Sequence, residues 1–310
     1  MIIIDYSQIS IAAFYAQPNA ELTEGFLRHL ILNTIRMYSK KYKDEYGQVV
    51  LACDGGNSWR KGIFPQYKAH RKKAREESKM DWNLFFELLN MIREEIKENF
   101  PYKVVHLDRT EADDVIAVLI EQTQEFGKNE PVMIISSDGD FIQLQKYKNV
   151  KQFSPIQKKV VTDSNPHLYL FDHVIRGDKG DGIPNVLSSD NCIVEGTRQT
   201  PITQKKVDEW LKNAEDLKSV MNEETYRNYQ RNRQLIDLSL IPEDITGEEL
   251  EKNVRGDLLT LSPENALIVS KHLSCVNLYA DGAPDLAYEH AMAASRHAGR
   301  VAVVRETAGY

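Results

Sequence analysis

Three short apolar runs in this chain end on aspartate, and these runs limit the fold that it can adopt. They are Ile2–Ile4 before Asp5, Val49–Cys53 before Asp54, and Val132–Ile135 before a Ser-Ser-Asp-Gly-Asp segment. The runs are rich in β-branched residues and lack alternating polar positions, which is typical of strands buried on both faces of a parallel sheet. We therefore predict an α/β fold with a mostly parallel sheet flanked by helices.

Helical patterns alternate with these strands in the first half of the chain. Apolar residues recur at helical spacing over Thr23–Tyr42 and over Trp82–Ile96, and a further strand is predicted at Lys103–Leu107. Strands that alternate with helices imply right-handed crossovers within one sheet.

A helix is predicted to begin near Thr110 and to end at Gly127. Thr110 is predicted to cap it, with Asp113 three residues later as in a variant of the capping box. From Gly177 onward the pattern is mainly helical, with candidate helices at 203–220, 223–236 and 263–274.

Length and composition limit the class of protein further. The chain has 310 residues, 42% of them hydrophobic, which suffices for one large domain or two ordinary ones. Its three cysteines are widely spaced, so the sequence indicates neither a disulfide framework nor a zinc site. A strand is predicted almost at the first residue, and no apolar run approaches the ~20 residues of a membrane span. We expect a soluble, intracellular protein.

Carboxylates gather where the predicted sheet would bind a ligand, beyond the carboxyl ends of its parallel strands. Four carboxylates at this edge would repel one another, and a hard divalent cation such as Mg²⁺ removes the conflict. They are Asp5, Asp54, Asp138 and Asp140. The sequence therefore predicts a metal-dependent enzyme.

More carboxylates follow in two segments that alone allow ordinary explanations. Glu111, Asp113 and Asp114 begin a predicted helix, where acids also serve as caps and complement the helix dipole. Asp178 and Asp181 lie in a glycine-containing loop. Their shared position at the same edge of the sheet favours a role in metal binding.

A basic segment follows Asp54, although the whole chain carries a net charge of −7. From Gly55 to Arg75 there is no acid, aromatic residues are interleaved, and seven residues are positively charged: Arg60, Lys61, Lys68, Arg71, Lys72, Lys73 and Arg75. This combination is typical of a surface that binds a phosphate backbone with exposed bases. A solvated basic surface is the alternative, and the position of the segment beside a predicted metal ligand favours nucleic acid.

Six motifs in order resemble those of the flap endonuclease, or 5′-nuclease, family, and within it the ribonucleases H of T-even-type bacteriophages. The similarity covers roughly residues 1–275. The motifs are Ile4-Asp5-Tyr6-Ser7, Cys53-Asp54-Gly55, Tyr67-Lys68-Ala69-His70-Arg71, Glu111-Ala112-Asp113-Asp114, Ser136-Ser137-Asp138-Gly139-Asp140 and Gly177-Asp178-Lys179-Gly180-Asp181-Gly182-Ile183-Pro184.

The resemblance implies a nuclease that cuts RNA–DNA hybrids, duplex DNA and 5′ flaps from the 5′ end and removes lagging-strand primers in phage replication. Two Mg²⁺ ions, with Mn²⁺ able to substitute, would activate water and stabilise the leaving oxygen. By motif match their ligands would be Asp5, Asp54, Glu111, Asp113, Asp114, Asp138, Asp140, Asp178 and Asp181.

The basic segment would belong to the family's helical arch, at about residues 59–98, through which a 5′ single strand is threaded. Lys68 and Arg71 match basic residues expected to act on the reacting phosphate. The residues expected to bind nucleic acid along the backbone are Arg60, Lys61, Lys72, Lys73 and Arg75. Because the segment is highly charged and has few large apolar anchors, we expect it to be mobile without substrate.

The domains expected are an α/β nuclease domain at 1–177 and a mainly helical duplex-DNA-binding domain at 178–310, with an unfamiliar tail at 280–310. The chain departs from the family after Pro184, where cellular members have a glycine-rich hairpin. The mode of duplex binding is therefore open. We expect a monomer in the cytoplasm of the infected bacterial host, with a phage single-strand-binding protein or a sliding clamp as candidate partners and no membrane.

Two other classes of function remain as alternatives. A phosphatase with an aspartyl nucleophile would want a second acid two residues after Asp5, where this chain has Ser7. A catalytically silent protein of the same fold that binds branched nucleic acid would be expected to lack some of the motif carboxylates, and none is missing.

Overall fold

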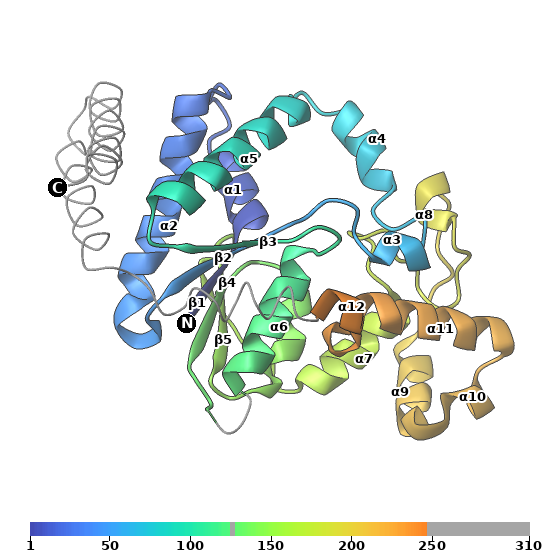
Figure 1. Ribbon diagram of the computed structural model, residues 1–310. Coiled ribbons are helices and arrows are strands. Elements are labelled where there is room, and N and C mark those ends of the chain that lie inside the picture. Colours follow the sequence, from blue (N-terminus) through green and yellow to red (C-terminus); the bar gives the residue numbers. More distant parts are fainter. Residues whose placement is uncertain (125–127, 247–310) are drawn as a thin grey trace, which may run out of the picture.

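A six-stranded sheet with the order β3-β2-β1-β4-β5-β6 forms the centre of the computed structural model, which describes residues 1–124 and 128–246 (Figure 1). Its strands are β1 (Ile2–Asp5), β2 (Val49–Cys53), β3 (Lys103–His106), β4 (Val132–Ile135), β5 (Val150–Ser154) and β6 (Lys159–Val161). The first five are parallel, and β6 runs antiparallel to β5. The predicted mostly parallel α/β fold is confirmed.

The three apolar runs that end on aspartate become β1, β2 and β4, which are buried along their whole length. The order of strands reverses between β1 and β4, the point at which open α/β sheets bind their ligands. Strands β5 and β6 were not predicted, because Lys151, Gln152 and Ser154 interrupt the apolar pattern of β5.

Helices cover both faces of the sheet (Figure 1). Residues Ile2 and Ile4 of β1 pack toward one face, whereas Ile3 packs toward the other. The first face is covered by α1 (Tyr6–Tyr15), α2 (Glu24–Tyr46) and α5 (Trp82–Asn99), and the second by α6 (Ala112–Gln124) and the 3₁₀ helix η2 (Asp140–Lys146).

The first turn of α6 is capped differently from the prediction. The hydroxyl of Thr110 donates to the carbonyl of Leu107 at 2.7 Å instead of accepting an amide of the helix. The amide of Glu111 donates to the carboxylate of Asp114 at 2.8 Å, and that of Ala112 donates to a side chain from the loop after β2. The predicted pairing of Thr110 with Asp113 is therefore wrong, because the local cap lies one residue later, between Glu111 and Asp114, and a tertiary contact from the loop after β2 completes it.

Beyond residue 177 the described chain, up to residue 246, contains helices and no strand. After α7 (Pro166–Arg176) come α8 (Cys192–Glu195), α9 (Gln204–Lys212), η3 (Ala214–Asp216), α10 (Leu217–Val220), α11 (Glu223–Ile236), η4 (Leu238–Leu240) and α12 (Glu243–Thr246). The helix predicted at 223–236 is confirmed, and that at 203–220 is divided into α9 and α10 by η3. The predicted helix at 263–274 and the tail at 280–310 lie outside the described residues, and the domain boundary at 177 stays a prediction.

Two short helices, α3 (Arg60–Ile63) and α4 (His70–Glu76), join β2 to α5 in the region of the predicted arch (Figure 1). None of the side chains of α4 is buried. In contrast, Phe64 and Tyr67 are each only 2% exposed and pack against Ile183 and Leu235. The expectation of few apolar anchors is therefore wrong for residues 59–68 and fits only the part around α4. Among the described residues, no helix is long and apolar enough to span a bilayer.

Candidate active site

Asp5 and Asp54 end two neighbouring parallel strands and lie at the carboxyl edge of the sheet. Asp5, only 5% exposed, accepts the amide of Gln8 at 3.0 Å and the hydroxyl of Ser136 at 3.0 Å. Asp54 follows β2 and accepts the amide of Ala112, the first residue of α6, at 3.0 Å. These hydrogen bonds fix both carboxylates beside the start of α6.

Two backbone segments approach each other closely at Gly55, and this approach brings Asp54 within hydrogen-bonding distance of the amide of Ala112. The amide of Gly55 donates to the carbonyl of Thr110 at 2.8 Å, so the loop after β2 lies against the loop after β3. A β-carbon at position 55 would lie 1.8 Å from the carbonyl oxygen of Leu107, far inside van der Waals contact. Only glycine allows the two loops to meet in this way.

Burial and mutual repulsion raise the pKa of four carboxyls in this group, those of Asp5, Asp113, Asp138 and Asp140. Burial, followed by the charges of Asp54 and Asp138, raises the pKa of Asp5 to about 7. Burial and then the charge of Asp138 raise the pKa of Asp113 and that of Asp140 well above their ordinary values. The charges of Lys68 near Asp113 and of His173 near Asp140 do not outweigh these effects, and a divalent ion with oxygen ligands fits the donor set.

Strand β5 braces the loop that carries Asp138. The buried side-chain amide of Gln152 donates to the carbonyls of Ser136 at 3.0 Å and Asp138 at 2.6 Å. Within the same loop, the carboxylate of Asp138 accepts the amide of Asp140 at 3.0 Å. The strand that the sequence did not predict thus positions two of the predicted carboxylates.

Asp114 and Arg60 form a buried ion pair outside this group. Asp114 is fully buried, and Arg60 is 3% exposed. Both carboxylate oxygens of Asp114 accept from Arg60, at 2.8 and 3.1 Å, and one also accepts from the indole of Trp59 at 3.1 Å. We propose that Asp114 anchors α3 to α6 and does not hold a metal. The buried position of Arg60 does not fit the predicted contact with nucleic acid.

Glu111 is the junction between the acidic group and the basic segment. One oxygen accepts from Arg60 at 3.0 Å and from the hydroxyl of Tyr67 at 2.7 Å, and the other accepts from Lys68 at 2.5 Å. Burial alone would raise the pKa of Glu111, but the charges of Lys68 and Arg60 outweigh it and lower that pKa. Glu111 is therefore ionised and already paired with cations.

Asp181 meets both of the predicted catalytic cations. Its carboxylate accepts from Arg71 at 2.6 Å and lies 3.5 Å from the ammonium of Lys68. It also lies 2.7 Å from the hydroxyl of Tyr67, whose single proton it shares with Glu111. The backbones are also joined, because the amide of Lys68 donates to the carbonyl of Asp181 at 2.7 Å. Lys68 has a φ of 56°, a left-handed conformation that is uncommon for residues other than glycine.

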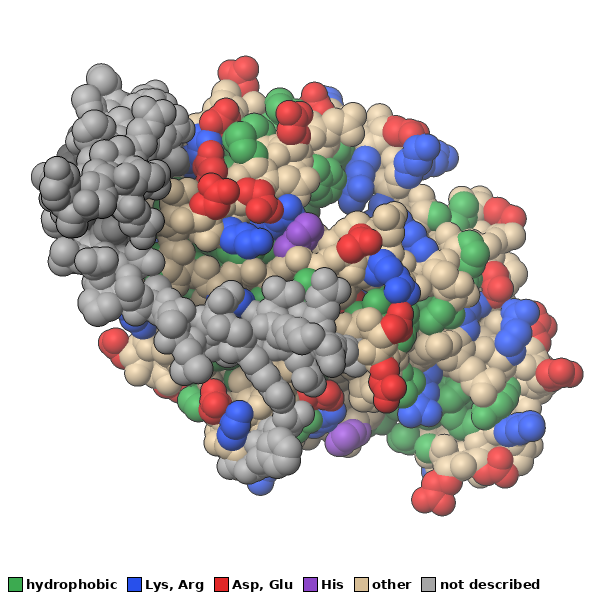
Figure 2. Space-filling model, viewed as in Figure 1, with side chains coloured by type: hydrophobic (Ala, Val, Ile, Leu, Met, Phe, Trp, Pro, Cys, Tyr) green, Lys and Arg blue, Asp and Glu red, His purple; other side chains and the backbone are tan. Residues whose placement is uncertain are grey.

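The other predicted nucleic-acid-binding side chains are exposed. They are Lys61, Lys72, Lys73 and Arg75. The guanidinium of Arg75 lies over the rings of Phe86, at 4.9 Å, and Trp82, at 5.5 Å. In the space-filling view an opening separates the α4–α5 segment from the body of the molecule, and Lys and Arg side chains border it (Figure 2).

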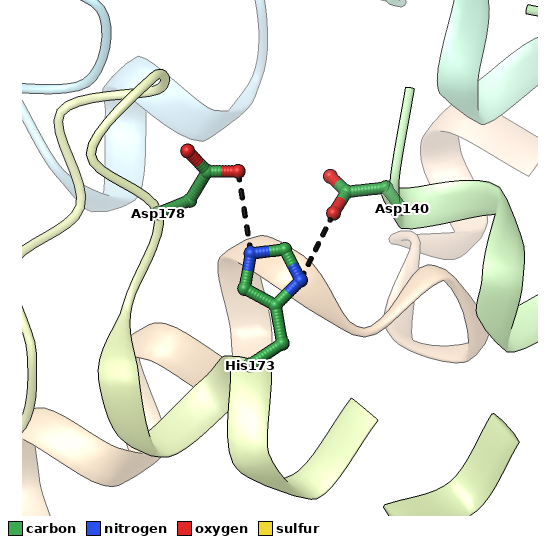
Figure 3. A group of neighbouring side chains, drawn as sticks. All are labelled: Asp140, His173 and Asp178. Atoms are coloured by element: carbon green, nitrogen blue, oxygen red, sulfur yellow. Dashed lines mark ion pairs between the residues drawn. The ribbon is translucent and has the colours of Figure 1, made fainter. Parts of the chain in front are cut away.

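His173, in the last turn of α7, lies between Asp140 and Asp178 (Figure 3). Its Nδ1 is 3.3 Å from an oxygen of Asp140, and its Nε2 is 3.3 Å from an oxygen of Asp178. The sequence indicates no function for this histidine, because no other metal-binding residue type stands at a recognisable spacing from it. Only the packing of α7 against η2 brings it to the site.

The structure brings eight of the nine predicted carboxylates into one group, in which the charges of neighbouring acids help to raise the pKa of four members. They are Asp5, Asp54, Glu111, Asp113, Asp138, Asp140, Asp178 and Asp181. Tyr67, Ser136 and His173 join this group without having been predicted. The position of Tyr67 next to Lys68 was the one available signal for it.

Two family models match the chain in succession. The first, the 5′-3′ exonuclease N-terminal resolvase-like domain, matches residues 1–168, and the second, the T4 RNase H C-terminal domain, matches residues 164–272.

Individual relatives carry related names. The ribonuclease H of Enterobacteria phage T4 is 39% identical over 253 residues, which cover 78% of this chain and 82% of that protein. A 5′-3′ exonuclease of Buchnera aphidicola is 27% identical over 60% of this chain and 65% of its own length. A flap endonuclease of Shewanella is 31% identical over 44% of this chain and 52% of its own length.

Solved structures agree in fold. A flap endonuclease of bacteriophage T5, in a pseudo-enzyme–product complex with DNA and metal ions, superposes with a TM-score of 0.59 at 22% identity. The match covers 82% of this chain and 96% of that one.

Proposed function

Because this chain belongs to the 5′-3′ exonuclease family, we propose that it is a metal-dependent nuclease that hydrolyses phosphodiester bonds from the 5′ end of RNA–DNA hybrids, duplex DNA and 5′ flaps. The names of its relatives, ribonuclease H, 5′-3′ exonuclease and flap endonuclease, support this substrate range. The observation that carries the proposal is the group of eight carboxylates, four of them with a raised pKa, that meets the basic segment at Glu111 and Asp181.

These carboxylates fit two Mg²⁺ ions, with Mn²⁺ able to substitute. The residues proposed to hold them, directly or through water, are Asp5, Asp54, Glu111, Asp113, Asp138, Asp140, Asp178 and Asp181. Bound in such a site, a pair of divalent ions supplies hydroxide near neutral pH and stabilises the leaving oxygen. Ser136 and Gln152 hold the acids in place, which preserves the geometry when the charges change.

Lys68 and Arg71 are proposed to act on the substrate phosphate. Both cations face carboxylates in the structure, at 2.5 Å for Lys68 with Glu111 and 2.6 Å for Arg71 with Asp181. A phosphate at the site would offer them a second anion, and they would neutralise the charge that develops on its oxygens. Tyr67 orients Glu111 and Asp181 through its hydroxyl.

The exposed cations of the arch are proposed to guide the nucleic-acid backbone. Lys61, Lys72, Lys73 and Arg75 are exposed, and Lys and Arg side chains border the opening in Figure 2. Arg75 and its aromatic neighbours Trp82 and Phe86 offer a surface on which an unpaired base could stack. The helical region after residue 177 is proposed to bind the duplex through its backbone.

In the organism, we propose that the protein acts as a monomer in the cytoplasm of a phage-infected bacterium and removes lagging-strand primers. The relative in phage T4 supports this setting. A phage single-strand-binding protein or a sliding clamp is a candidate partner.

A cleavage assay tests the function directly. A 5′-labelled RNA–DNA hybrid and a 5′-flap duplex are each incubated with the protein in Mg²⁺ or EDTA, with the Asp138→Asn variant beside it. Short products from the 5′ end, formed only in Mg²⁺ and not by the variant, are expected. If both substrates bind equally well in Mg²⁺ and in EDTA and neither is cut, the protein is instead a binder of branched nucleic acid.

A further inference from the structure

His173 occupies a position between two acidic side chains that belong to different elements. Asp140 begins η2, Asp178 follows α7, and the ring of His173 lies between them (Figure 3). One ligand atom from each of the three residues lies within 4.8 Å of the others. Oxygen and nitrogen donors thus converge on one small region of the proposed metal site.

The two ring nitrogens have different surroundings. Nε2 lies 3.3 Å from an oxygen of Asp178. Nδ1 lies 3.3 Å from Oδ1 of Asp140. Both of these atoms are buried, and neither has a hydrogen-bond partner within the described part of the chain.

The contact between these two atoms is an ion pair when the imidazole is protonated. With a neutral ring, two buried polar atoms that face each other without a hydrogen bond destabilise the fold unless a bound cation contacts both. Asp140 is only 9% exposed, so solvent cannot readily satisfy its Oδ1. A cation bound by both atoms removes the cost, and the separation of 3.3 Å lets both contact one ion at the ~2.0–2.2 Å typical of such bonds.

We propose that His173 is a direct ligand, through Nδ1, of the divalent ion that Asp140 holds. This inference rests on the proposed metal-dependent function. Asp178 then accepts the N–H of Nε2 and holds the ring with Nδ1 free to bind the ion. A carboxylate that orients a metal-bound histidine in this way is a common arrangement, and its loss typically weakens binding by about 10–100-fold.

A nitrogen ligand changes the choice of metal. Mg²⁺ strongly favours oxygen ligands, whereas imidazole suits transition-metal ions. Relative to a site made of carboxylates alone, this site should therefore favour Mn²⁺ or Co²⁺ over Mg²⁺. The alternative role for His173 is a protonated imidazolium that only balances the charges of Asp140 and Asp178.

Electron paramagnetic resonance of bound Mn²⁺ separates the two roles without any measurement of cleavage. The full chain is loaded with Mn²⁺ alone, and the coupling of ¹⁴N to the ion is recorded. We expect a nitrogen coupling in the unmodified protein, its loss in His173→Gln, and its retention in His167→Gln, which alters an exposed histidine in the first turn of the same helix. Mn²⁺ affinity should fall at least about tenfold in His173→Gln, and Mg²⁺ affinity should fall less.

A second substitution tests the charge-balancing role. Lysine at position 173 can carry a positive charge but no ring nitrogen, so His173→Lys should bind Mn²⁺ as weakly as the glutamine variant or more weakly. The inference is overturned if the unmodified protein shows no nitrogen coupling, if the coupling survives in His173→Gln, or if His173→Lys keeps the original affinity.

Failure of this inference is distinct from failure of the proposed function. Metal-dependent cleavage without nitrogen coupling would leave the nuclease proposal standing and remove His173 as a ligand. Nitrogen coupling without cleavage of either substrate would leave His173 as a metal ligand and contradict the nuclease proposal.

Discussion

The ammonium of Lys68 lies 2.5 Å from a carboxylate oxygen of Glu111, so a cation of the basic segment is paired with an acid of the metal site before any substrate is present. Lys68 is tied to the same region by its backbone, through the bond of its amide to Asp181 at 2.7 Å. A substrate phosphate must therefore compete with Glu111 for this ammonium. The ability of Lys68 to bind the phosphate should therefore depend on whether Glu111 and Asp181 are also bound to metal ions.

Removing one carboxylate from the metal site should abolish most of the chemistry. In Asp138→Asn or Asp5→Asn we expect cleavage to fall by at least about 10³-fold, because a misplaced metal removes several kcal/mol of transition-state stabilisation. DNA binding should persist or tighten, since a negative charge facing phosphate is lost. The exposed Asp44 on α2 provides a control in Asp44→Asn. Cleavage within tenfold of the unmodified protein in either site variant would exclude that residue from the site.

Lys68→Ala should lose chemistry more than affinity. Single-turnover cleavage at saturating enzyme should slow by about 10²-fold or more, because a donor aimed at developing charge is removed. The dissociation constant for DNA should change only modestly. A normal rate at saturation would show that Lys68 serves only as a contact to the backbone.

Lys72 and Lys73 should show the opposite behaviour. Both are exposed on α4, so replacing them with alanine removes charge without disturbing the packed part of the arch. The slope of the logarithm of the binding constant against that of salt concentration should become shallower by about 1.4–1.8, since each phosphate contact contributes about 0.7–0.9. Single-turnover chemistry at saturation should change little. An unchanged salt slope would place these lysines away from the nucleic acid.

The buried pair of Arg60 and Asp114 should stabilise the fold, and its removal should strongly lower the free energy of unfolding. Arg60→Met leaves a fully buried carboxylate without its partner, and we expect the free energy of unfolding to fall by about 3–5 kcal/mol. The exposed pair of Lys151 and Glu45, 3.5 Å apart, is the control, and Lys151→Met should cost less than about 1 kcal/mol. Urea unfolding measures both. Equal effects would mean that Arg60 faces solvent.

Without metal, stability should fall as the pH rises through the acidic range. The pKa of Asp5 is raised by burial, and then by Asp54, from 3.8 to about 7. Below about pH 4 this carboxyl is protonated in both states, and between about 4 and 7 only the unfolded chain releases the proton. The contribution of Asp5 to the free energy of unfolding should therefore decrease over this interval, by at most about 1.4 kcal/mol per pH unit, and level off above it.

Urea unfolding in EDTA at several pH values checks this dependence, and Asp5→Asn provides the comparison. The variant should lack the part of the decrease that Asp5 contributes, and saturating Mg²⁺ should reduce the decrease in the unmodified protein. Parallel pH profiles for the two proteins would contradict the raised pKa of Asp5.

The arch should be open to proteases at α4 and closed to them at its base. Trypsin should cut rapidly at Lys72, Lys73 and Arg75, and slowly at Arg60, whose side chain is buried. A 5′-flap substrate in Ca²⁺ should protect α4, and a duplex without a free 5′ end should protect it much less. Equal protection by both would indicate that the arch clamps duplex and that no 5′ strand is threaded.

The framework of the sheet could be predicted because burial on both faces leaves a readable signal. Strands such as β1 and β4 consist of little but large apolar residues, and their ends place Asp5 and Asp138 at one edge. Strand β5 could not be predicted, because the buried polar side chain of Gln152 interrupts its apolar pattern. This side chain hydrogen-bonds the loop that carries Asp138.

The candidate site could be predicted as a set of carboxylates but not as a network. Arg60 looks like any other cation of the basic segment, and only tertiary packing turns it inward to Asp114. His173 stands five residues before Asp178, a spacing with no meaning until α7 packs against η2. Long-range contacts of this kind leave no local pattern in the sequence.

The meeting of two loops at Gly55 has a consequence for how the protein tolerates variation. A single methyl group at this position would push the loop after β2 away from Leu107 and take Asp54 from its bond to the first amide of α6. A saturation screen for activity would therefore rank position 55 with the carboxylates themselves. Glycine would score as an essential residue there although it has no side chain that could take part in the reaction.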